Sequence, residues 1–141
     1  MIAFAEVSDL LGMIKPKGAI ESPLQFVDLI EKGLPLKALD RIATRIAPSD
    51  ATFKYRIVPK ATLARYTVRL NATQSTRVAR LAGVWALARK VWRSDEEARD
   101  FLFRPHQLLE GRRPIDVAIE NELGGELVRD TLGRLEYGSA V

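Results

Sequence analysis

Apolar side chains recur at intervals of three and four residues along most of the chain, which is the spacing of helices that bury one face. No segment alternates apolar and polar residues in the manner of a half-buried strand. The pattern predicts helices over residues 22–33, 35–47, 48–58, 59–70, 73–92, 95–105, 114–123 and 126–138. We therefore expect an all-α protein.

Residues that favour the ends of helices mark several of these boundaries. The expected N-terminal caps are Ser22 before Pro23, Ser49 or Asp50, Asn71 or Thr73, and Ser94. Gly33 is expected to end the first of these helices. Gly124 and Gly125 are expected to form the turn before the last one.

Helical spacing also predicts which side chains face the core. The first helix places Leu24, Val27 and Ile30 on one apolar stripe, with Phe26 and Leu29 beside them. The last should turn Leu127, Val128, Thr131, Leu132 and Leu135 inward. The helix over 73–92 is apolar on most sides, so it is buried in its own core or against a second copy, which favours a homodimer. Trp85 and Trp92 lie two turns apart on that helix and are candidate core or dimer anchors.

The two short helices over 48–58 and 59–70 are joined by a tight link, which is typical of a helix-turn-helix. This divides the chain into an N-terminal arm or short helix (1–20), a helix-turn-helix DNA-binding domain (21–72) and a helical domain (73–141).

Charge is distributed unevenly along the chain, whose net charge is +4. Residues 51–93 contain 10 basic and no acidic side chains, whereas residues 94–141 contain 6 basic and 11 acidic ones. A segment without carboxylates produces a positive field that suits phosphates. We therefore expect nucleic acid as one partner, and the acidic third suggests a second, different partner.

The outward positions of the two short helices supply the candidate DNA contacts, because basic side chains and threonine bind phosphates and base edges. These residues are Lys54, Arg56, Lys60, Thr62, Arg65 and Arg69. The same spacing also allows Arg69 to lie on the far side of the helix. The alternative is a helical bundle that merely has a basic surface.

No template for catalysis is present. The chain has no cysteine and one histidine, His106, which follows Pro105 in a polar stretch without an evident nucleophile or carboxylate partner. We therefore expect no enzyme activity, no cofactor and no metal site. No apolar run reaches the length of a membrane span. A cytoplasmic protein without membrane association is the expectation.

Several segments, in order, resemble the Xre/MbcA/ParS antitoxins of bacterial type II toxin–antitoxin systems, those that are paired with RES-domain toxins. The matching segments are "EKGLPLKALDRIA" (31–43), "TLAR" (62–65), "RVARLAGVWALARKVW" (77–92), "SDEEARDFL" (94–102), "LLEGRRPIDV" (108–117) and "GGELVRDTLGRLEYG" (124–138). The C-terminal segments are the most specific of these.

The resemblance implies an Xre-like helix-turn-helix that binds the operator of its own operon, followed by a helical toxin-binding domain, in a protein that is typically dimeric. RES toxins degrade NAD, and the antitoxin covers the toxin with its C-terminal end directed into the active site. The toxin contacts that it implies are Arg104, Arg112, Arg134, Glu136, Tyr137, Gly138, Ser139 and Val141.

The chain departs from the family pattern in the recognition segment, where Ile57, Val58 and Pro59 replace the usual turn and two basic positions are lost. Three hypotheses follow. The chain is an antitoxin that also represses its operon, an antitoxin that has lost DNA binding, or a stand-alone helix-turn-helix regulator without a toxin partner.

Overall fold

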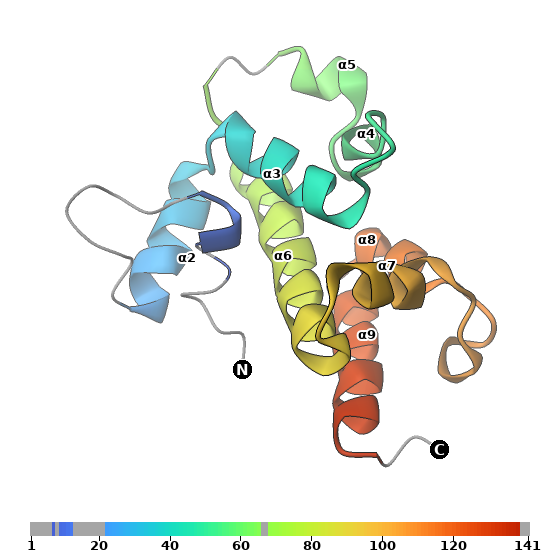
Figure 1. Cartoon of the computed structure of the whole chain (residues 1–141). Helices are drawn as coiled ribbons and strands as arrows, with labels where there is room; N and C mark the ends of the chain where they lie inside the picture. The colour runs from blue at the N-terminus through green and yellow to red at the C-terminus, as the bar shows by residue number, and fades with distance from the viewer. Residues whose placement is uncertain (1–6, 8, 13–21, 66–67, 139–141) are drawn as a thin grey trace. The chain divides into compact units, whose positions relative to one another are not determined.

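The computed structural model describes Val7 and residues 9–12, 22–65 and 68–138 (Figure 1). Within these residues the regular secondary structure is helical, and no strand is present. The helices are α2 (Pro23–Lys32), α3 (Leu36–Ile46), α4 (Lys54–Ile57), α5 (Lys60–Leu63), α6 (Ala72–Trp92), α7 (Asp95–Phe103), α8 (Pro114–Glu120) and α9 (Glu122–Glu136). A single 3-10 turn, η1 (Gln107–Leu109), precedes α8. The all-α prediction is confirmed.

The chain forms two compact units, residues 1–82 and 83–141, and the division falls within α6. The expected domain limits of 21–72 and 73–141 stay a prediction. Most of the expected arm, residues 1–20, lies outside the described residues. Of its described part, Val7 and Leu11 are fully buried.

Polar side chains cap α2 and α6, as predicted. Ser22 Oγ accepts a hydrogen bond from the amide of Gln25 at the start of α2. Asn71 and Gln74 cap α6 reciprocally, because each side-chain oxygen accepts from the other residue's amide, at 2.9 and 3.1 Å. Gly33 ends α2 with a positive φ of 100°, which only glycine adopts at little cost.

The core of the first unit is built on α3, whose apolar stripe is entirely buried. Its members are Ala38, Leu39, Ile42, Ala43 and Ile46. The predicted stripe of α2 is wrong at Leu24 and Val27, which are 73% and 48% exposed, whereas Phe26 beside it is buried. The face of α2 that packs inward is thus rotated from the one that spacing favoured.

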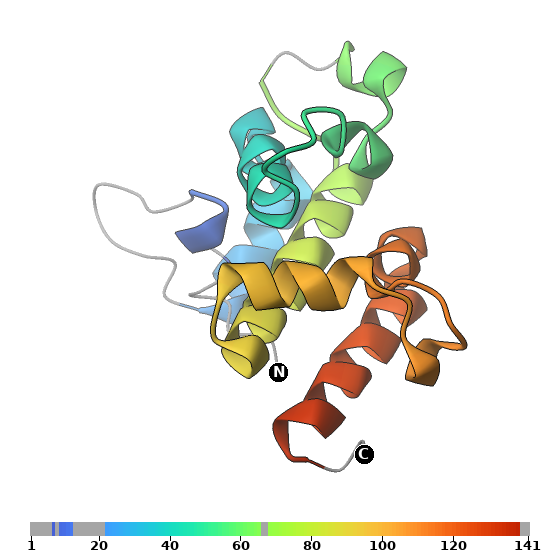
Figure 2. The ribbon, with the colours of Figure 1, turned by 45° about the vertical axis from the view of Figure 1, so that its right-hand side comes forward.

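Both short helices of the predicted helix-turn-helix are shorter than expected (Figure 2). Asp50 does not cap a helix, because its carboxylate accepts hydrogen bonds from the amide and hydroxyl of Thr52 in a turn. The predicted helix over 59–70 is also wrong at 64–65 and 68–70, while 66–67 lie outside the described residues. The amide of Leu70 donates to Leu34 O at 2.8 Å, so the chain pairs with the loop before α3 instead of continuing as a helix.

In the second unit, Ser94 caps α7 as predicted, with its Oγ accepting from the amide of Glu97. The predicted break at Gly124-Gly125 is wrong. Asn121 caps α9, its Oδ1 accepting from the amide of Gly124 at 2.8 Å, so both glycines lie inside the helix.

Glycine is required at 124 for packing. A Cβ there would collide with the carbonyl oxygen of Val117 on α8, so the two helices approach closely at this point. Of the five residues expected to face inward, Val128, Thr131 and Leu132 are buried and Leu135 is partly buried, but Leu127 is 46% exposed. The expectation for Leu127 is wrong.

Candidate functional site

The first candidate surface lies on α4 and α5, where the structure brings two predicted DNA contacts together. The Nζ atoms of Lys54 and Lys60 lie 5.4 and 5.6 Å from the centre of the Tyr55 ring. Both distances are within the range of a cation–π interaction. The tyrosine thereby holds two ammonium groups on neighbouring helices against one ring.

Lys54 also has a second role within the unit. Its Nζ lies 3.0 Å from Asp40 Oδ1 on α3, and this hydrogen bond raises the pKa of Lys54 above its ordinary value. The side chain thus ties α4 to α3, and the Asp40 carboxylate offsets part of its charge. Lys60 has no acidic partner among the described residues and is exposed.

The other predicted DNA contacts are placed less uniformly. Arg56 is exposed and its guanidinium lies 5.8 Å from the centre of the Phe53 ring. Arg65 is exposed and Thr62 is half-buried. Arg69 Nη1 donates to the carbonyl oxygen of Gly33 at 2.9 Å, which anchors the segment after α5 to the end of α2.

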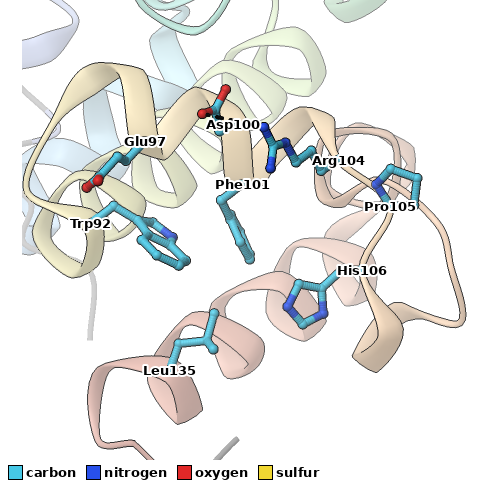
Figure 3. A pocket seen from close by; sticks show the side chains of 8 residues that line it. All are labelled: Trp92, Glu97, Asp100, Phe101, Arg104, Pro105, His106 and Leu135. Atoms are coloured by element: carbon cyan, nitrogen blue, oxygen red, sulfur yellow. Dashed lines mark ion pairs between the residues drawn. The ribbon is translucent and has the colours of Figure 1, made fainter. Parts of the chain in front are cut away.

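The second candidate site is a pocket of roughly 340 Å³ in the second unit, between α7, the segment after it and α9 (Figure 3). Its wall is largely aromatic. The ring of Phe101 lies between those of Trp92 and His106. The centres of the Phe101 and Trp92 rings are 6.0 Å apart. The centres of the Phe101 and His106 rings are 5.6 Å apart, in an edge-to-face arrangement. Leu135 points toward these rings from α9. The pocket is suited to an apolar group.

Charged residues line the same pocket. Glu97 and Asp100 come from α7, and Arg104 follows the helix. Arg104 Nη2 lies 4.0 Å from Asp100 Oδ2, which is the outer limit of an ion pair between two exposed side chains and contributes little. Arg104 is the predicted toxin contact that the structure places at the pocket.

The remaining predicted toxin contacts lie on other parts of the second unit. Arg112 Nη2 lies 2.8 Å from Glu120 Oε2, so it links the loop after η1 to α8. Glu136 lies 3.6 Å from Lys90 Nζ. Arg134 is exposed at the end of α9, and Tyr137 is 82% exposed.

Gly138 has a φ of 69°, which ends α9 in the left-handed conformation. Ser139 and Val141, the last two predicted contacts, lie outside the described residues.

The two tryptophans differ in their surroundings. Trp85 is 1% exposed, and the central carbon of the Arg99 guanidinium lies over its ring, 5.5 Å from the ring centre. Trp92 is partly exposed and lines the pocket. Its role as a dimer anchor stays a prediction.

Sequence reasoning missed several residues of both sites. Tyr55 gathers the two lysines of the first site, and Phe101 and Leu135 form the wall of the pocket. Tyr55 lies next to Lys54 and five residues before Lys60, so an aromatic residue among the basic positions was the available signal. The pocket had no signal in the sequence, because its wall joins three separate segments.

His106 has a structural role. Its Nδ1 accepts a hydrogen bond from the amide of Leu108 and thereby caps η1. Within the part of the chain that the structure describes, no three histidine, cysteine or acidic side chains form a group that could hold a metal ion. Nor is any described helix both long and apolar enough to cross a membrane.

The fold and the two sites define a class of protein in which a helix-turn-helix unit precedes a separate helical unit with an exposed C-terminal end. Two family models match the chain in that order. The antitoxin Xre-like helix-turn-helix domain matches residues 25–83, and the antitoxin Xre/MbcA/ParS C-terminal toxin-binding domain matches residues 87–138. A comparison with curated proteins finds no match.

The chain belongs to the antitoxins that combine an Xre-like helix-turn-helix with an Xre/MbcA/ParS C-terminal toxin-binding domain. The resemblance seen in the sequence is confirmed to that extent. Both families are non-enzymatic, so the protein is a binding module with a toxin and DNA as its classes of partner.

Proposed function

We propose that this antitoxin neutralises a RES-type, NAD-degrading toxin by placing its C-terminal end over the toxin's active site, and that it represses its own operon. The observation that carries the proposal is the succession of the two matched domains, 25–83 and 87–138. RES toxins are the proposed class because the C-terminal segments of the sequence resemble antitoxins paired with them.

The exposed end of α9 supports the proposed mode of inhibition. Tyr137 is 82% exposed, and tyrosine is among the residues that most often dominate the free energy of protein–protein binding. Gly138 then directs the chain out of the helix, through its left-handed φ. Residues that are not needed for the core are thus presented at one end of the domain, where a toxin pocket can receive them.

Co-expression with the RES toxin encoded beside this chain tests the proposal. The wild-type chain should restore growth, preserve cellular NAD and purify together with the toxin. Deletion of residues 134–141 should leave the fold intact, because the buried residues of α9 end at Leu132, and should abolish protection. Separate purification of the two proteins with an active toxin would refute the proposal.

DNA binding by the α4–α5 surface is the second part of the proposal. Exposed cationic side chains that contact phosphates release counterions, so affinity falls as salt rises. Replacement of Lys60 and Arg65 by alanine should weaken binding to the chain's own promoter and reduce the salt slope by about 0.9 for each phosphate contact that is lost. Lys32→Ala, on α2, is the matched control and should bind like the wild type.

Equal binding by wild type and the Lys60→Ala, Arg65→Ala double variant would remove this surface from the proposal. If the wild type also fails to bind its promoter but still neutralises the toxin, the chain is an antitoxin without DNA binding. Neutralisation and DNA binding are therefore measured on the same preparations.

We also propose that the protein acts as a homodimer in the cytoplasm, where the NAD that the toxin degrades is found. The support is the resemblance to dimeric antitoxins. Trp85 does not add to it, because this side chain is buried within its own chain. Light scattering after size-exclusion chromatography should give twice the 15.8 kDa mass of one chain. A monomer at micromolar concentration would contradict the dimer.

A further inference from the structure

One face of α9 is exposed along its whole length, although the helix packs tightly through its other face. The exposed positions follow helical periodicity at i, i+4, i+7, i+11 and i+14. They are Leu123, Leu127, Asp130, Arg134 and Tyr137, with Glu126 beside them. We call these six residues the outer face of α9.

Three large apolar side chains on this face are exposed. Leu123 is 65% exposed and Leu127 is 46% exposed, one turn apart, and Tyr137 is 82% exposed at the other end. Single exposed apolar residues are common on protein surfaces and need no explanation. Here two leucines and an aromatic residue lie on the same face of one helix. This pattern is typical of a helix that binds in a groove of a partner protein.

The charges on the same face also indicate a partner. Glu126 and Asp130 are four residues apart, and like charges at this spacing destabilise a helix. Both are exposed, and neither has an ion-pair partner among the described residues. Their carboxylates border Leu127 and are open to cationic side chains of another molecule.

We infer that the outer face of α9 docks into an apolar groove of the toxin that is bordered by basic side chains, and that Leu123 and Leu127 are its anchors. The inference rests on the proposed function and extends it, because the interface then begins at Leu123, nearly four turns before the end of α9. The whole of α9 lies within the matched toxin-binding domain, 87–138. Its outer face is continuous with Tyr137, where the proposed active-site contact begins.

A second copy of this chain is the less suitable occupant. The outer face runs for about 21 Å and is about 10 Å wide, from the rise and diameter of a helix, which gives an area on the order of 200 Å². Each partner of a stable dimer buries roughly 800 Å². In the toxin complex, the predicted contacts outside this face would add to its area, namely Arg104, Arg112, Glu136 and Gly138.

Removal of the two anchors tests the inference on the full-length chain. The double variant Leu123→Gln, Leu127→Gln removes apolar surface and preserves helix propensity, since glutamine is close to leucine on that scale. Burial of one leucine contributes about 1.5–3 kcal/mol, so affinity for the purified RES toxin should fall at least tenfold. Leu24→Gln on α2 removes a leucine that is 73% exposed and should leave affinity unchanged.

The charged positions provide a separate measurement. Glu126→Gln combined with Asp130→Asn should weaken toxin binding mainly at low salt, because exposed charges are screened as ionic strength rises. Far-UV circular dichroism of each variant should match the wild type, since none of the four side chains is buried.

The outcomes separate the two proposals. If the wild type binds the toxin and the Leu123→Gln, Leu127→Gln variant binds it equally well, the docking face is wrong and the proposed function stands. If that variant keeps full affinity for the toxin but loses self-association in light scattering, the occupant is a second copy and the inference is overturned. If the wild type binds no RES toxin, both proposals fall.

Discussion

Two glycines on α9 should respond to alanine in opposite directions. Gly124 and Gly133 both lie inside the helix, where glycine costs roughly 0.5–1 kcal/mol relative to alanine. An added Cβ at Gly133 meets no atom within 4 Å, whereas at Gly124 it collides with the carbonyl oxygen of Val117. The same substitution thus tests helix propensity at one position and helix packing at the other.

The expected magnitudes follow from these surroundings. Gly133→Ala should raise the free energy of unfolding by about 0.5–1 kcal/mol, since only helix propensity changes. At Gly124 the obstacle is backbone, which moves only if α8 shifts, and such overpacking costs typically about 1–3 kcal/mol. After the gain in propensity is subtracted, Gly124→Ala should lower the free energy of unfolding by up to about 2 kcal/mol.

Tryptophan fluorescence is the suitable assay, because both tryptophans of the chain, Trp85 and Trp92, lie in the second unit together with α9. Guanidinium unfolding of the wild type and the two variants should place the midpoints in the order Gly124→Ala, wild type, Gly133→Ala. A Gly124→Ala variant as stable as Gly133→Ala would show that α8 and α9 do not approach as closely as the structure has them.

Three further predictions concern local hydrogen bonds. Ser75→Ala removes the buried hydroxyl that accepts from the amide of Leu34 at 2.8 Å and should destabilise the first unit by about 1–3 kcal/mol in thermal unfolding; an unchanged melting temperature would contradict this. Ser94→Ala removes the cap of α7 and should lower the free energy of unfolding by about 1 kcal/mol, measured by tryptophan fluorescence. A loss as large as that of a core substitution would show that Ser94 does more than cap the helix. Hydrogen bonds from Thr52 to the Asp50 carboxylate hold the pKa of Asp50 below its ordinary value, and the bond from the hydroxyl has a larger effect than the bond from the amide. The contribution of this turn to stability is therefore present above the pKa of Asp50 in the unfolded chain. It is lost as pH falls through the pKa in the folded chain. Thr52→Val should raise the pKa of Asp50 in an NMR titration, and an unchanged pKa would refute the role of the hydroxyl.

The ends of helices were predictable wherever a local hydrogen bond decides them. Ser22, Asn71 and Ser94 each cap the helix that was expected to follow, because the side chain reaches an amide three residues ahead whatever the rest of the chain does. Asp50 failed as a cap although it has the right chemistry. Its carboxylate bonds to Thr52, two residues ahead, and this turn competes with the helix.

Tertiary contacts were not predictable from spacing. Leu70 is in helical register with Leu63, but its amide donates to the carbonyl oxygen of Leu34 in the loop before α3, 36 residues earlier in the chain. Helical spacing likewise assigned Leu24 and Val27 to the core, whereas Phe26 occupies it. Spacing shows that a helix has an apolar side, and the packing partner determines which neighbouring residue is covered.

The same limit applies to the candidate sites. A run of basic residues without acidic neighbours in the sequence indicated the positive charge of the α4–α5 surface. It could not indicate that the carboxylate of Asp40, on α3, offsets part of the charge of Lys54. The pocket in the second unit joins Trp92, Phe101 and Leu135 from three segments, so no local pattern could indicate it.

The position of Leu127 connects the packing of α9 with its function. Glycines at 124 and 125 looked like a break between helices, so the apolar residues after them were all assigned to one inward stripe. In the structure the missing side chain at Gly124 lets α9 lie directly against α8, and the tightly packed face is the one that contains Gly124, Val128 and Thr131. Close packing through small residues leaves Leu123 and Leu127 beside this packed face, where they are 65% and 46% exposed. The feature that stabilises the unit therefore also determines which leucines are available to a partner.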